Sequence, residues 1–255
     1  MELNAFTNLL TEKRVFIGFD RDGTLVPYAD HPDEAFLDEC VKMQLEKLSL
    51  LPNVTVAIIS ARSIAQLGRD MHGSADRLIL AGNYGLEISF PDHSEFMHPD
   101  AVRLKKTLRK LKLELFKRLP PLGSVIIEDH GLSLCVHYHR TDINERREII
   151  QAVTTFAKLY PELTFINLAT SFEIMPARNW NKGSALDIIE SKVGFDQDDW
   201  SLLYFGDSVS DEPAFSWINN RGGISVRIGE AKITESSIQM KSCSDLIGLL
   251  NMAIK

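Results

Sequence analysis

Two aspartates at the end of an apolar run are the residues of this chain best suited to chemistry. The run 15–19 (VFIGF) is followed by Asp20, Arg21, Asp22 and Gly23. A short run of β-forming residues that ends in a glycine turn predicts a buried strand of a parallel sheet, and such sheets bind ligands at the carboxyl ends of their strands. Two carboxylates at that edge offer a nucleophile, an acid/base and most of a magnesium site. This set suits phosphoryl transfer through an aspartyl-phosphate.

Three further segments bring groups of the same chemistry to the ends of predicted elements. The apolar runs 54–59 and 202–205 predict two more buried strands, and residue 182 begins a predicted helix, whose positive end favours an anion. The residues that follow these strands or open this helix are Ser60, Ala61, Arg62, Lys182, Asp207 and Asp211. Taken singly, Lys182 could be a surface lysine, and Asp207 or Asp211 could be a helix cap. Four separate segments that bring such residues to strand ends favour a catalytic site instead.

The residue types predict a role for each acid. Asp20 is the expected nucleophile, which attacks phosphorus once a cation offsets the repulsion between its carboxylate and a phosphomonoester dianion. Mg²⁺ suits oxygen donors, and we expect Asp20, Asp207 and the main-chain carbonyl of Asp22 to hold it. Asp22 is expected to protonate the leaving oxygen and then to deprotonate the attacking water. Asp211, in the same metal group, is expected to orient a metal-bound water or Lys182.

The phosphoryl oxygens need donors, and the remaining residues of the motif supply them. Ser60, Ala61 and Arg62 offer a hydroxyl and backbone amides at the sheet edge, and Lys182 offers an ammonium group. Arg21 lies between the two acids of the first motif. Strand alternation predicts that its side chain points away from both of them.

The order of strand and helix patterns predicts an α/β protein with an inserted second domain. Before residue 98 and after residue 175, strand-like runs alternate with helical patterns, which indicates βαβ units and a doubly wound, Rossmann-like parallel sheet. Between them the order is helix, two strands, helix, two strands, with a hairpin turn at 129–131. The sequence therefore predicts a catalytic core of residues 1–97 and 176–255 and an α+β cap of residues 98–175.

The predicted elements have the following approximate bounds. Helices are expected at 34–48, from 63, at 101–119, at 144–159, from 182, after 211 and at the end of the chain, and further strands at 78–81, 124–128, 132–138, 163–167, 171–175 and 224–226.

The motifs together resemble a known superfamily. Segments 19–32 (FDRDGTLVPYADHP), 60–62 (SAR), 173–186 (EIMPARNWNKGSAL) and 206–215 (GDSVSDEPAF) resemble the haloacid dehalogenase-type phosphohydrolases. With segments 81–87 (AGNYGLE) and 128–138 (EDHGLSLCVHY), the chain is similar to the trehalose-6-phosphate phosphatase family within that superfamily. This resemblance implies a magnesium-dependent phosphatase that acts on a small phosphosugar, first of all trehalose 6-phosphate.

The resemblance also implies which residues contact the sugar. In this family a cap domain closes over the site, and its acidic and basic side chains bind sugar hydroxyls. The positions that match here are Asn83, Glu128, His130, His139 and Glu173. Where the family usually carries a lysine and an arginine, this chain has His130 and His139, which are shorter and titrate near neutral pH. The identity of the sugar is therefore less firmly implied than the reaction.

The composition excludes several classes of protein. A formal net charge of −7 over 255 residues argues against a nucleic-acid binder. The cysteines, Cys40, Cys135 and Cys243, form no C-x-x-C pair and predict reduced thiols rather than structural zinc. No apolar run reaches membrane-spanning length and the first residues form no signal-peptide core, so we expect a soluble, cytoplasmic protein.

One predicted helix, 101–118, carries a strong local positive charge. Its cations are Arg103, Lys105, Lys106, Arg109, Lys110, Lys112, Lys117 and Arg118, against one acid, Glu114. A solvated outer face of the cap explains this charge. The alternative is a docking surface for an acidic partner or a membrane, or a field that attracts phosphorylated substrates.

Three other functions stay open at this point. The first is a phosphatase for another phosphosugar, such as a glycosyl-phosphoglycerate. The second is a phosphosugar mutase of the same superfamily, which would return the phosphoryl group to a sugar hydroxyl. The third is an inactive relative with a regulatory role, which the presence of Asp20, Asp22, Lys182 and Asp207 disfavours.

Overall fold

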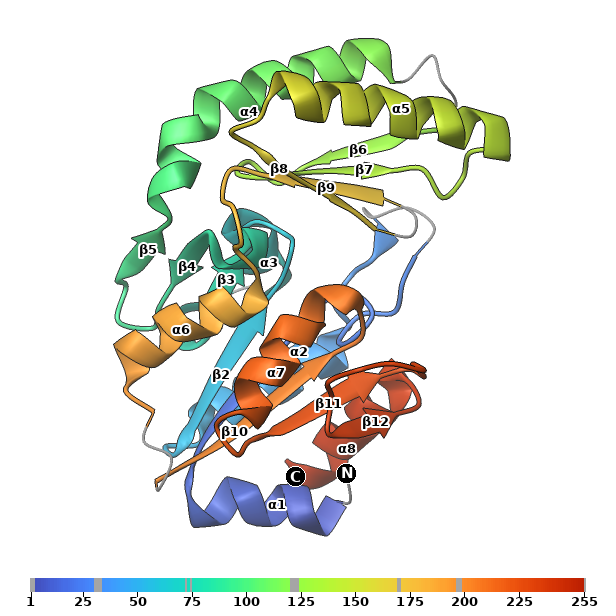
Figure 1. The fold of residues 1–255 in the computed structure, drawn as a ribbon. Coiled ribbons are helices and arrows are strands. Elements are labelled where there is room, and N and C mark those ends of the chain that lie inside the picture. Colours follow the sequence, from blue (N-terminus) through green and yellow to red (C-terminus); the bar gives the residue numbers. More distant parts are fainter. Residues whose placement is uncertain are drawn as a thin grey trace. The chain divides into compact units, whose positions relative to one another are not determined.

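The computed structural model describes residues 3–29, 34–71, 73, 75–119, 124–168, 171–195 and 199–254. The chain forms two compact units (Figure 1). One, called here the core unit, comprises Met1–Glu95 and Asn181–Lys255, and the other, the inserted unit, comprises Phe96–Trp180. The chain thus leaves the core unit after Glu95 and returns at Asn181, whereas the sequence places these crossings at 97/98 and 175/176.

The core unit is built on a largely parallel sheet. The strands of this sheet are β1 (Arg14–Phe19), β2 (Val54–Ile59), β3 (Ile79–Gly82), β4 (Glu87–Ser89), β5 (Glu95–Met97), β10 (Trp200–Gly206), β11 (Ile224–Ile228) and β12 (Ile238–Met240). Strand β5 extends two residues past the end of this unit at Glu95. The strands follow the order β12-β11-β10-β1-β2-β3-β4-β5. The pairs from β12 to β3 are parallel, and β4 runs antiparallel to β3. The strand that leads to Asp20 therefore lies in the interior of the sheet, between β2 and β10.

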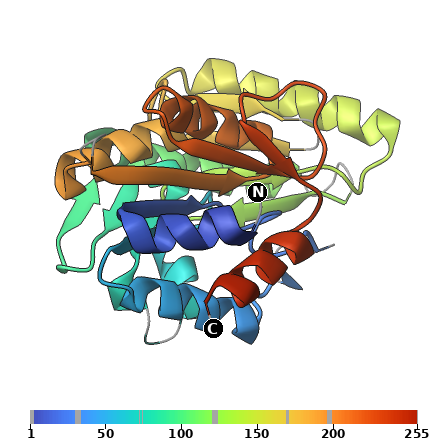
Figure 2. The same cartoon turned by 90° about the horizontal axis from the view of Figure 1, so that it is seen from below.

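Helices cover both faces of this sheet (Figure 2). The helices are α1 (Leu3–Glu12), α2 (Glu39–Leu50), α3 (Ile64–Met71), α6 (Lys182–Val193), α7 (Glu212–Asn219) and α8 (Cys243–Ala253). Apolar residues of α1, α2, α3 and α8 pack with Val15, Ile17 and Phe19 on one face of β1. On the other face, the ring of Tyr204 packs against that of Phe215 in α7. The predicted doubly wound α/β core is therefore confirmed.

The inserted unit is an antiparallel sheet covered by two helices. Its strands β6 (Ile126–Asp129), β7 (Leu134–His137), β8 (Thr164–Asn167) and β9 (Ser171–Met175) follow the order β6-β7-β9-β8. Helices α4 (Pro99–Arg118) and α5 (Ile143–Leu159) cover one face, where leucines of α4 pack with Val136 and Ile174. Because side chains alternate along a strand, the neighbours of these residues, among them Cys135 and Glu173, lie on the opposite face. We call this opposite face the polar face.

Several elements differ from the sequence predictions. Helix α2 begins at Glu39, not near residue 34, because the side chain of Asp38 caps it by accepting a hydrogen bond from the Cys40 amide. Helix α1 and the three-residue strands β4, β5 and β12 were not predicted. A three-residue strand is too short to show an alternating pattern, and helix α1 follows no strong start signal.

The basic helix α4 forms as predicted, and part of its charge is balanced locally. Arg103 pairs with Asp100, and Lys112 pairs with Asp129 at the end of β6. The apolar stripe of α4 is buried, so most of its cations lie on the outer side of the helix. In the described ranges, no helix has both the length and the apolar character needed to cross a membrane.

A substitution at Gly85 tests the packing of the core unit. Gly85 has a φ of +85°, and a Cβ atom there would lie 2.3 Å from the Cβ of Ala185 in α6. We expect Gly85→Ala to lower the free energy of unfolding, with about 1–3 kcal/mol from overpacking in addition to the cost of the left-handed backbone. Gly222→Ala is the matched control, because its φ is +72° and nothing lies within 4 Å of the added atom. Urea unfolding of both variants measures the difference, and equal losses would contradict the packing seen here.

Candidate active site

The carboxyl ends of three neighbouring strands bring the predicted residues together. In the sheet, Phe19 is paired with Ile58 of β2 and with Phe205 of β10, and the amide of Asp20 donates a hydrogen bond to the Phe205 carbonyl at 2.8 Å. The residues that follow these strands therefore lie at one edge. They are Asp20, Ser60 and Asp207, and the first two are buried.

Lys182 joins two of the acids. Its Nζ lies 2.8 Å from Oδ1 of Asp20 and 2.7 Å from Oδ1 of Asp211, and the side chain is only 1% exposed. It occupies the first turn of α6, whose N-terminus is capped by the side chain of Asn181. Burial alone would lower the pKa of Lys182, but the two carboxylates outweigh it and raise this pKa above its ordinary value. The ammonium charge is therefore permanent at neutral pH.

Asp211 anchors this lysine and is itself saturated with donors. Its Oδ1 accepts hydrogen bonds from Lys182 and from the hydroxyl of Tyr204, and its Oδ2 accepts from the amide and hydroxyl of Ser208. Burial raises the pKa of Asp211, but Lys182 and these hydrogen bonds lower it by more, so that the pKa lies below its ordinary value. Gly206 lets the carboxylate approach, since a Cβ there would lie 2.4 Å from Cγ of Asp211.

Asp207 has the features of a cation ligand. Its Oδ1 is buried and makes no hydrogen bond with the described residues, whereas its Oδ2 accepts one from Tyr28 at 2.8 Å. Burial and the nearby Asp211 raise its pKa to about 6, and the same two causes raise the pKa of Asp20 well above its usual value. Oxygens of Asp20, Asp207 and Asp211 all lie within 4.8 Å of one another.

This acidic group fits Mg²⁺. Its donors are carboxylate oxygens, which Mg²⁺ prefers, and one of them is buried with no hydrogen bond from the described residues. A divalent cation would also offset the repulsion that, in addition to burial, raises the pKa values of Asp20 and Asp207. Gly23 leaves room for Asp207, because a Cβ at Gly23 would lie 2.3 Å from its carboxylate.

Asp22 is held by two arginines. Nε and Nη2 of Arg62 lie 2.8 and 2.9 Å from its two carboxylate oxygens, a bidentate pair. Nη1 of Arg21 also pairs with Asp22, while its other nitrogens reach Asp70 and the carbonyl of Ala35. The prediction that Arg21 points away from Asp22 was therefore wrong. Strand β1 ends at Phe19, so strand alternation no longer applies at residue 21.

The predicted phosphate donors and Asn83 surround the end of β2. The hydroxyl of Ser60 accepts a hydrogen bond from the amide of Arg62 at 3.2 Å, and Ala61 lies between them. Asn83, fully buried, donates its own amide to the Arg62 carbonyl and its side-chain amide to Glu87. Asn83 is thus placed directly behind the 60–62 segment and supports it.

The polar face of the inserted unit gathers four of the predicted sugar contacts around two residues that were not predicted. Cys135 is paired with Glu128 across β6 and with Glu173 across β9. His137 lies 2.6 Å from Glu128, and the ring of His130 lies 4.0 Å from the same carboxylate. His139 is exposed beyond the end of β7, next to the ring of His137.

The sequence analysis did not select four residues that the structure places at these sites, namely Tyr28, Tyr204, Cys135 and His137. For Cys135 and His137 a signal existed, because they alternate with the core residues Leu134 and Val136 and so share a face with Glu173. Tyr28 and Tyr204 carry no motif of their own, and only the fold shows that they reach Asp207 and Asp211.

Comparisons with known proteins point to one family. The family model described as trehalose-phosphatase matches residues 18–245. The probable trehalose-phosphate phosphatase J of Arabidopsis thaliana is 25% identical over 268 aligned residues, which cover 99% of this chain and 71% of that protein. The structure of the C-terminal domain of a C. albicans trehalose-6-phosphate phosphatase has the same fold, with a TM-score of 0.82, 20% identity and coverage of 100% and 97%. An Aspergillus fumigatus trehalose-6-phosphate phosphatase aligns with a TM-score of 0.65, 25% identity and coverage of 99% and 97%.

The raised pKa of Asp207 predicts how stability responds to pH and to magnesium. The pKa is raised from 3.8 to about 6, so the stability that protonation provides is present below 3.8 and is lost as pH rises through about 6. Without metal, Asp207→Asn should therefore be more stable than the wild type above pH 6 and similar to it near pH 4. Magnesium at 100 times its Kd should stabilise the wild type by about 2.7 kcal/mol and the variant much less.

Chemical unfolding in chelator and in magnesium, at several pH values, measures both effects. Asp199→Asn is the control, because it makes the same change at an exposed residue beside the opposite end of β10. A full magnesium effect in Asp207→Asn would show that this carboxylate does not hold the ion.

Proposed function

We propose that this chain, which belongs to the trehalose-phosphatase family, hydrolyses a sugar phosphomonoester through a covalent phosphate on Asp20. As a member of this family it is a phosphoric monoester hydrolase. Trehalose 6-phosphate is the substrate that we propose first, because the relatives above are named for it. The observation that carries the mechanism is the meeting of Asp20, Lys182 and Asp207 at one sheet edge.

In the first step, a carboxylate oxygen of Asp20 forms a bond to phosphorus and the bond from phosphorus to the sugar oxygen breaks. The leaving oxygen takes a proton from Asp22, so the sugar departs as a neutral alcohol. In the second step, water attacks phosphorus, Asp22 takes the proton from this water, and the bond between phosphorus and Asp20 breaks. Both acids then return to their starting states, and inorganic phosphate is the product.

Charge compensation decides whether Asp20 can approach a phosphate dianion. Lys182 supplies one permanent positive charge at 2.8 Å from the attacking carboxylate. Asp20 and Asp207, with the main-chain carbonyl of Asp22, would hold Mg²⁺, which when bound neutralises charge on both the carboxylate and the phosphate. The oxygens of Asp211 already accept hydrogen bonds, so we propose that it acts mainly by orienting Lys182.

The residues that follow β2 and the two arginines complete the proposed site. Ser60 and the backbone amides of residues 61 and 62 are proposed to hold the phosphoryl oxygens together with Lys182. Arg62 and Arg21 hold the carboxylate of Asp22 from two sides. Asp22 is proposed to leave this pairing and to take up a proton before it acts as the acid of the first step.

The polar face of the inserted unit is proposed as the sugar-binding surface of a cap domain. Its carboxylates and imidazoles are suitable partners for sugar hydroxyls. Glu128 on β6 and Glu173 on β9 lie on either side of β7, and His130 lies in the turn between β6 and β7. Asn83 and His139 remain proposed contacts of the same sugar. Because imidazoles replace the two cations usual in the family, another phosphosugar, such as a glycosyl-phosphoglycerate, is the second candidate substrate. A cytoplasmic location and an acidic partner for α4 stay predictions.

A substrate panel tests the proposed function. Released phosphate is measured for trehalose 6-phosphate, a glycosyl-phosphoglycerate and simpler phosphosugars, with magnesium and with a chelator. We expect one phosphosugar to be clearly preferred, activity to be lost in chelator, and Asp20→Asn to lower kcat by at least 10³-fold while its melting curve stays cooperative. Isomerised sugar phosphate in place of free phosphate would indicate a mutase, and substantial activity of Asp20→Asn would remove Asp20 as nucleophile.

If Asp22 is the acid, the activity that is lost when it is replaced should depend on the leaving group of the substrate. Asp22→Asn should lower kcat/KM for a sugar phosphate by about 10²–10⁴-fold, because a sugar alkoxide needs a proton as it leaves. For an aryl phosphate, whose phenolate leaves unaided, the loss in kcat/KM should be much smaller. Steady-state kinetics with both substrates give the comparison, and an equal loss for the two would argue that Asp22 has a structural role only.

A further inference from the structure

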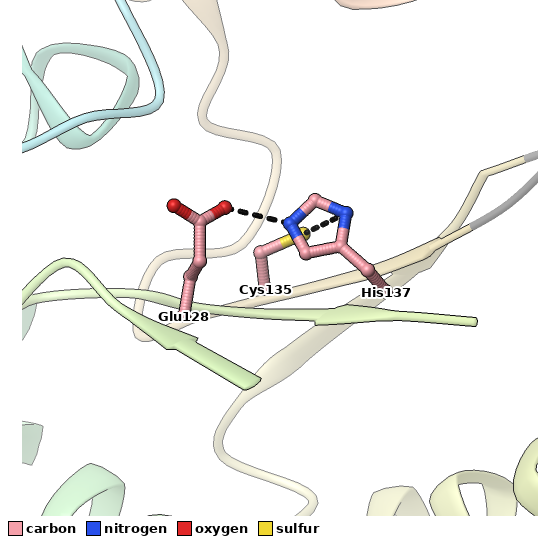
Figure 3. Close-up of side chains that lie close together, drawn as sticks. All are labelled: Glu128, Cys135 and His137. Atoms are coloured by element: carbon pink, nitrogen blue, oxygen red, sulfur yellow. Dashed lines mark hydrogen bonds and ion pairs between the residues drawn. The ribbon is translucent and has the colours of Figure 1, made fainter. Parts of the chain in front are cut away.

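Three side chains of types that commonly bind metals, a carboxylate, a thiol and an imidazole, meet on the polar face of the inserted unit (Figure 3). Glu128 and Cys135 are directly paired across β6 and β7, and His137 lies two residues beyond Cys135 on the same face. Cys135 Sγ lies 3.8 Å from Nδ1 of His137, and Nε2 of His137 lies 2.6 Å from Oε2 of Glu128. One ligand atom from each residue can be chosen so that all three lie within 4.8 Å of one another.

We propose that Glu128, Cys135 and His137 form a binding site for a thiophilic divalent cation of the zinc class. A thiolate, an imidazole and a carboxylate are the ligands that Zn²⁺ takes in proteins, with bonds of about 2.0–2.3 Å. Such bonds place ligand atoms about 3.3–3.8 Å apart. To bind the cation, the half-buried side chains of Glu128 and His137 would therefore have to give up their 2.6 Å contact and rotate. A fourth position is left for water or for Glu173, which is the other cross-strand partner of Cys135.

The electrostatics of the polar face favour a cation at this point. Cys135 lies between two carboxylates, Glu128 on β6 and Glu173 on β9, and its side chain is 2% exposed. Burial and Glu173 raise the pKa of its thiol, with a smaller contribution from Glu128. A bound cation offsets this negative field, and the thiol then loses its proton to solvent as the bond from sulfur to metal forms. Binding should therefore release protons and strengthen as pH rises.

The two candidate metal sites of this chain favour different kinds of metal ion. The acidic group around Asp20 offers oxygen atoms only, which suits Mg²⁺, whereas the Cys135 site offers sulfur and nitrogen as well. The spacing E-x₆-C-x-H matches no common zinc motif, so a search of the sequence for such motifs does not find the site. Strand pairing creates it.

Binding at this site has a consequence that rests on the proposed function. Glu128 is a proposed sugar contact, so a cation that occupies it competes with the sugar for the same carboxylate. Zn²⁺ should therefore inhibit hydrolysis of a sugar phosphate by raising its KM. Hydrolysis of a small aryl phosphate, which has no sugar to contact Glu128, should be affected much less.

Cobalt absorption tests the site directly. Co²⁺ is titrated into the full-length, reduced protein in excess magnesium, and absorption from thiolate-to-cobalt charge transfer is recorded. We expect one Co²⁺ per chain, displaced by Zn²⁺, in the wild type and in the control Cys40→Ser, whose cysteine lies on α2 of the core unit. Cys135→Ser and His137→Asn should lose the band while keeping the wild-type circular dichroism spectrum. A wild-type protein without the band, or a Cys135→Ser protein that keeps it, would overturn the proposal.

The activity measurement separates this inference from the proposed function. If the chain does not hydrolyse sugar phosphates, the cobalt spectra still decide whether the site exists. If it does, Zn²⁺ should raise the KM for the sugar phosphate at least 10-fold in wild type and in Cys40→Ser but not in Cys135→Ser. Equal inhibition of Cys135→Ser would assign the inhibition to the magnesium site and contradict the competition at Glu128.

Discussion

The buried ammonium of Lys182 between Asp20 and Asp211 is the interaction on which the rest of the core site depends. The ends of β1 and β10 bring carboxylates to one edge, where burial raises the pKa values of Asp20 and Asp207 and their mutual repulsion adds to this rise. Lys182 offsets part of it from the first turn of α6, at 2.7–2.8 Å from two of the acids. Removing one partner of such a buried pair typically costs about 3–5 kcal/mol, because a charge is left uncompensated. Folding of the core unit and placement of Asp20, the proposed nucleophile, are therefore linked.

Much of this site follows from the sequence, and the reason is the geometry of parallel sheets. Apolar runs reveal buried strands, parallel strands share one carboxyl edge, and so Asp20, Ser60 and Asp207 had to lie close together. Arg21 shows the limit of this reasoning. Its position was inferred from strand alternation, but β1 ends before it, and its guanidinium turns toward Asp22 and Asp70. Partners that come from distant segments without a motif, such as Tyr204, are visible only once the chain is folded.

In the inserted unit, one small sheet has an apolar face that packs in the core and a polar face that is proposed to bind the sugar. Its apolar face packs against α4 and α5, while its polar face carries acids, imidazoles and a thiol on adjacent strands. Alternation along the strand places Val136 in the core and Cys135 on the polar face, so neither role restricts the other. The same arrangement explains why the residues proposed for sugar contact and those proposed for a thiophilic cation share Glu128.

The central claim is that Asp20 carries the phosphoryl group during turnover. The direct measurement is to quench the protein with acid during steady-state turnover of its best phosphosugar, digest it and locate any added phosphate by mass spectrometry. The account predicts a phosphate on the peptide that contains Asp20, present only with substrate and magnesium and absent from Asp20→Asn. A protein that turns over at its full rate with phosphate on another residue, or on none, would contradict it.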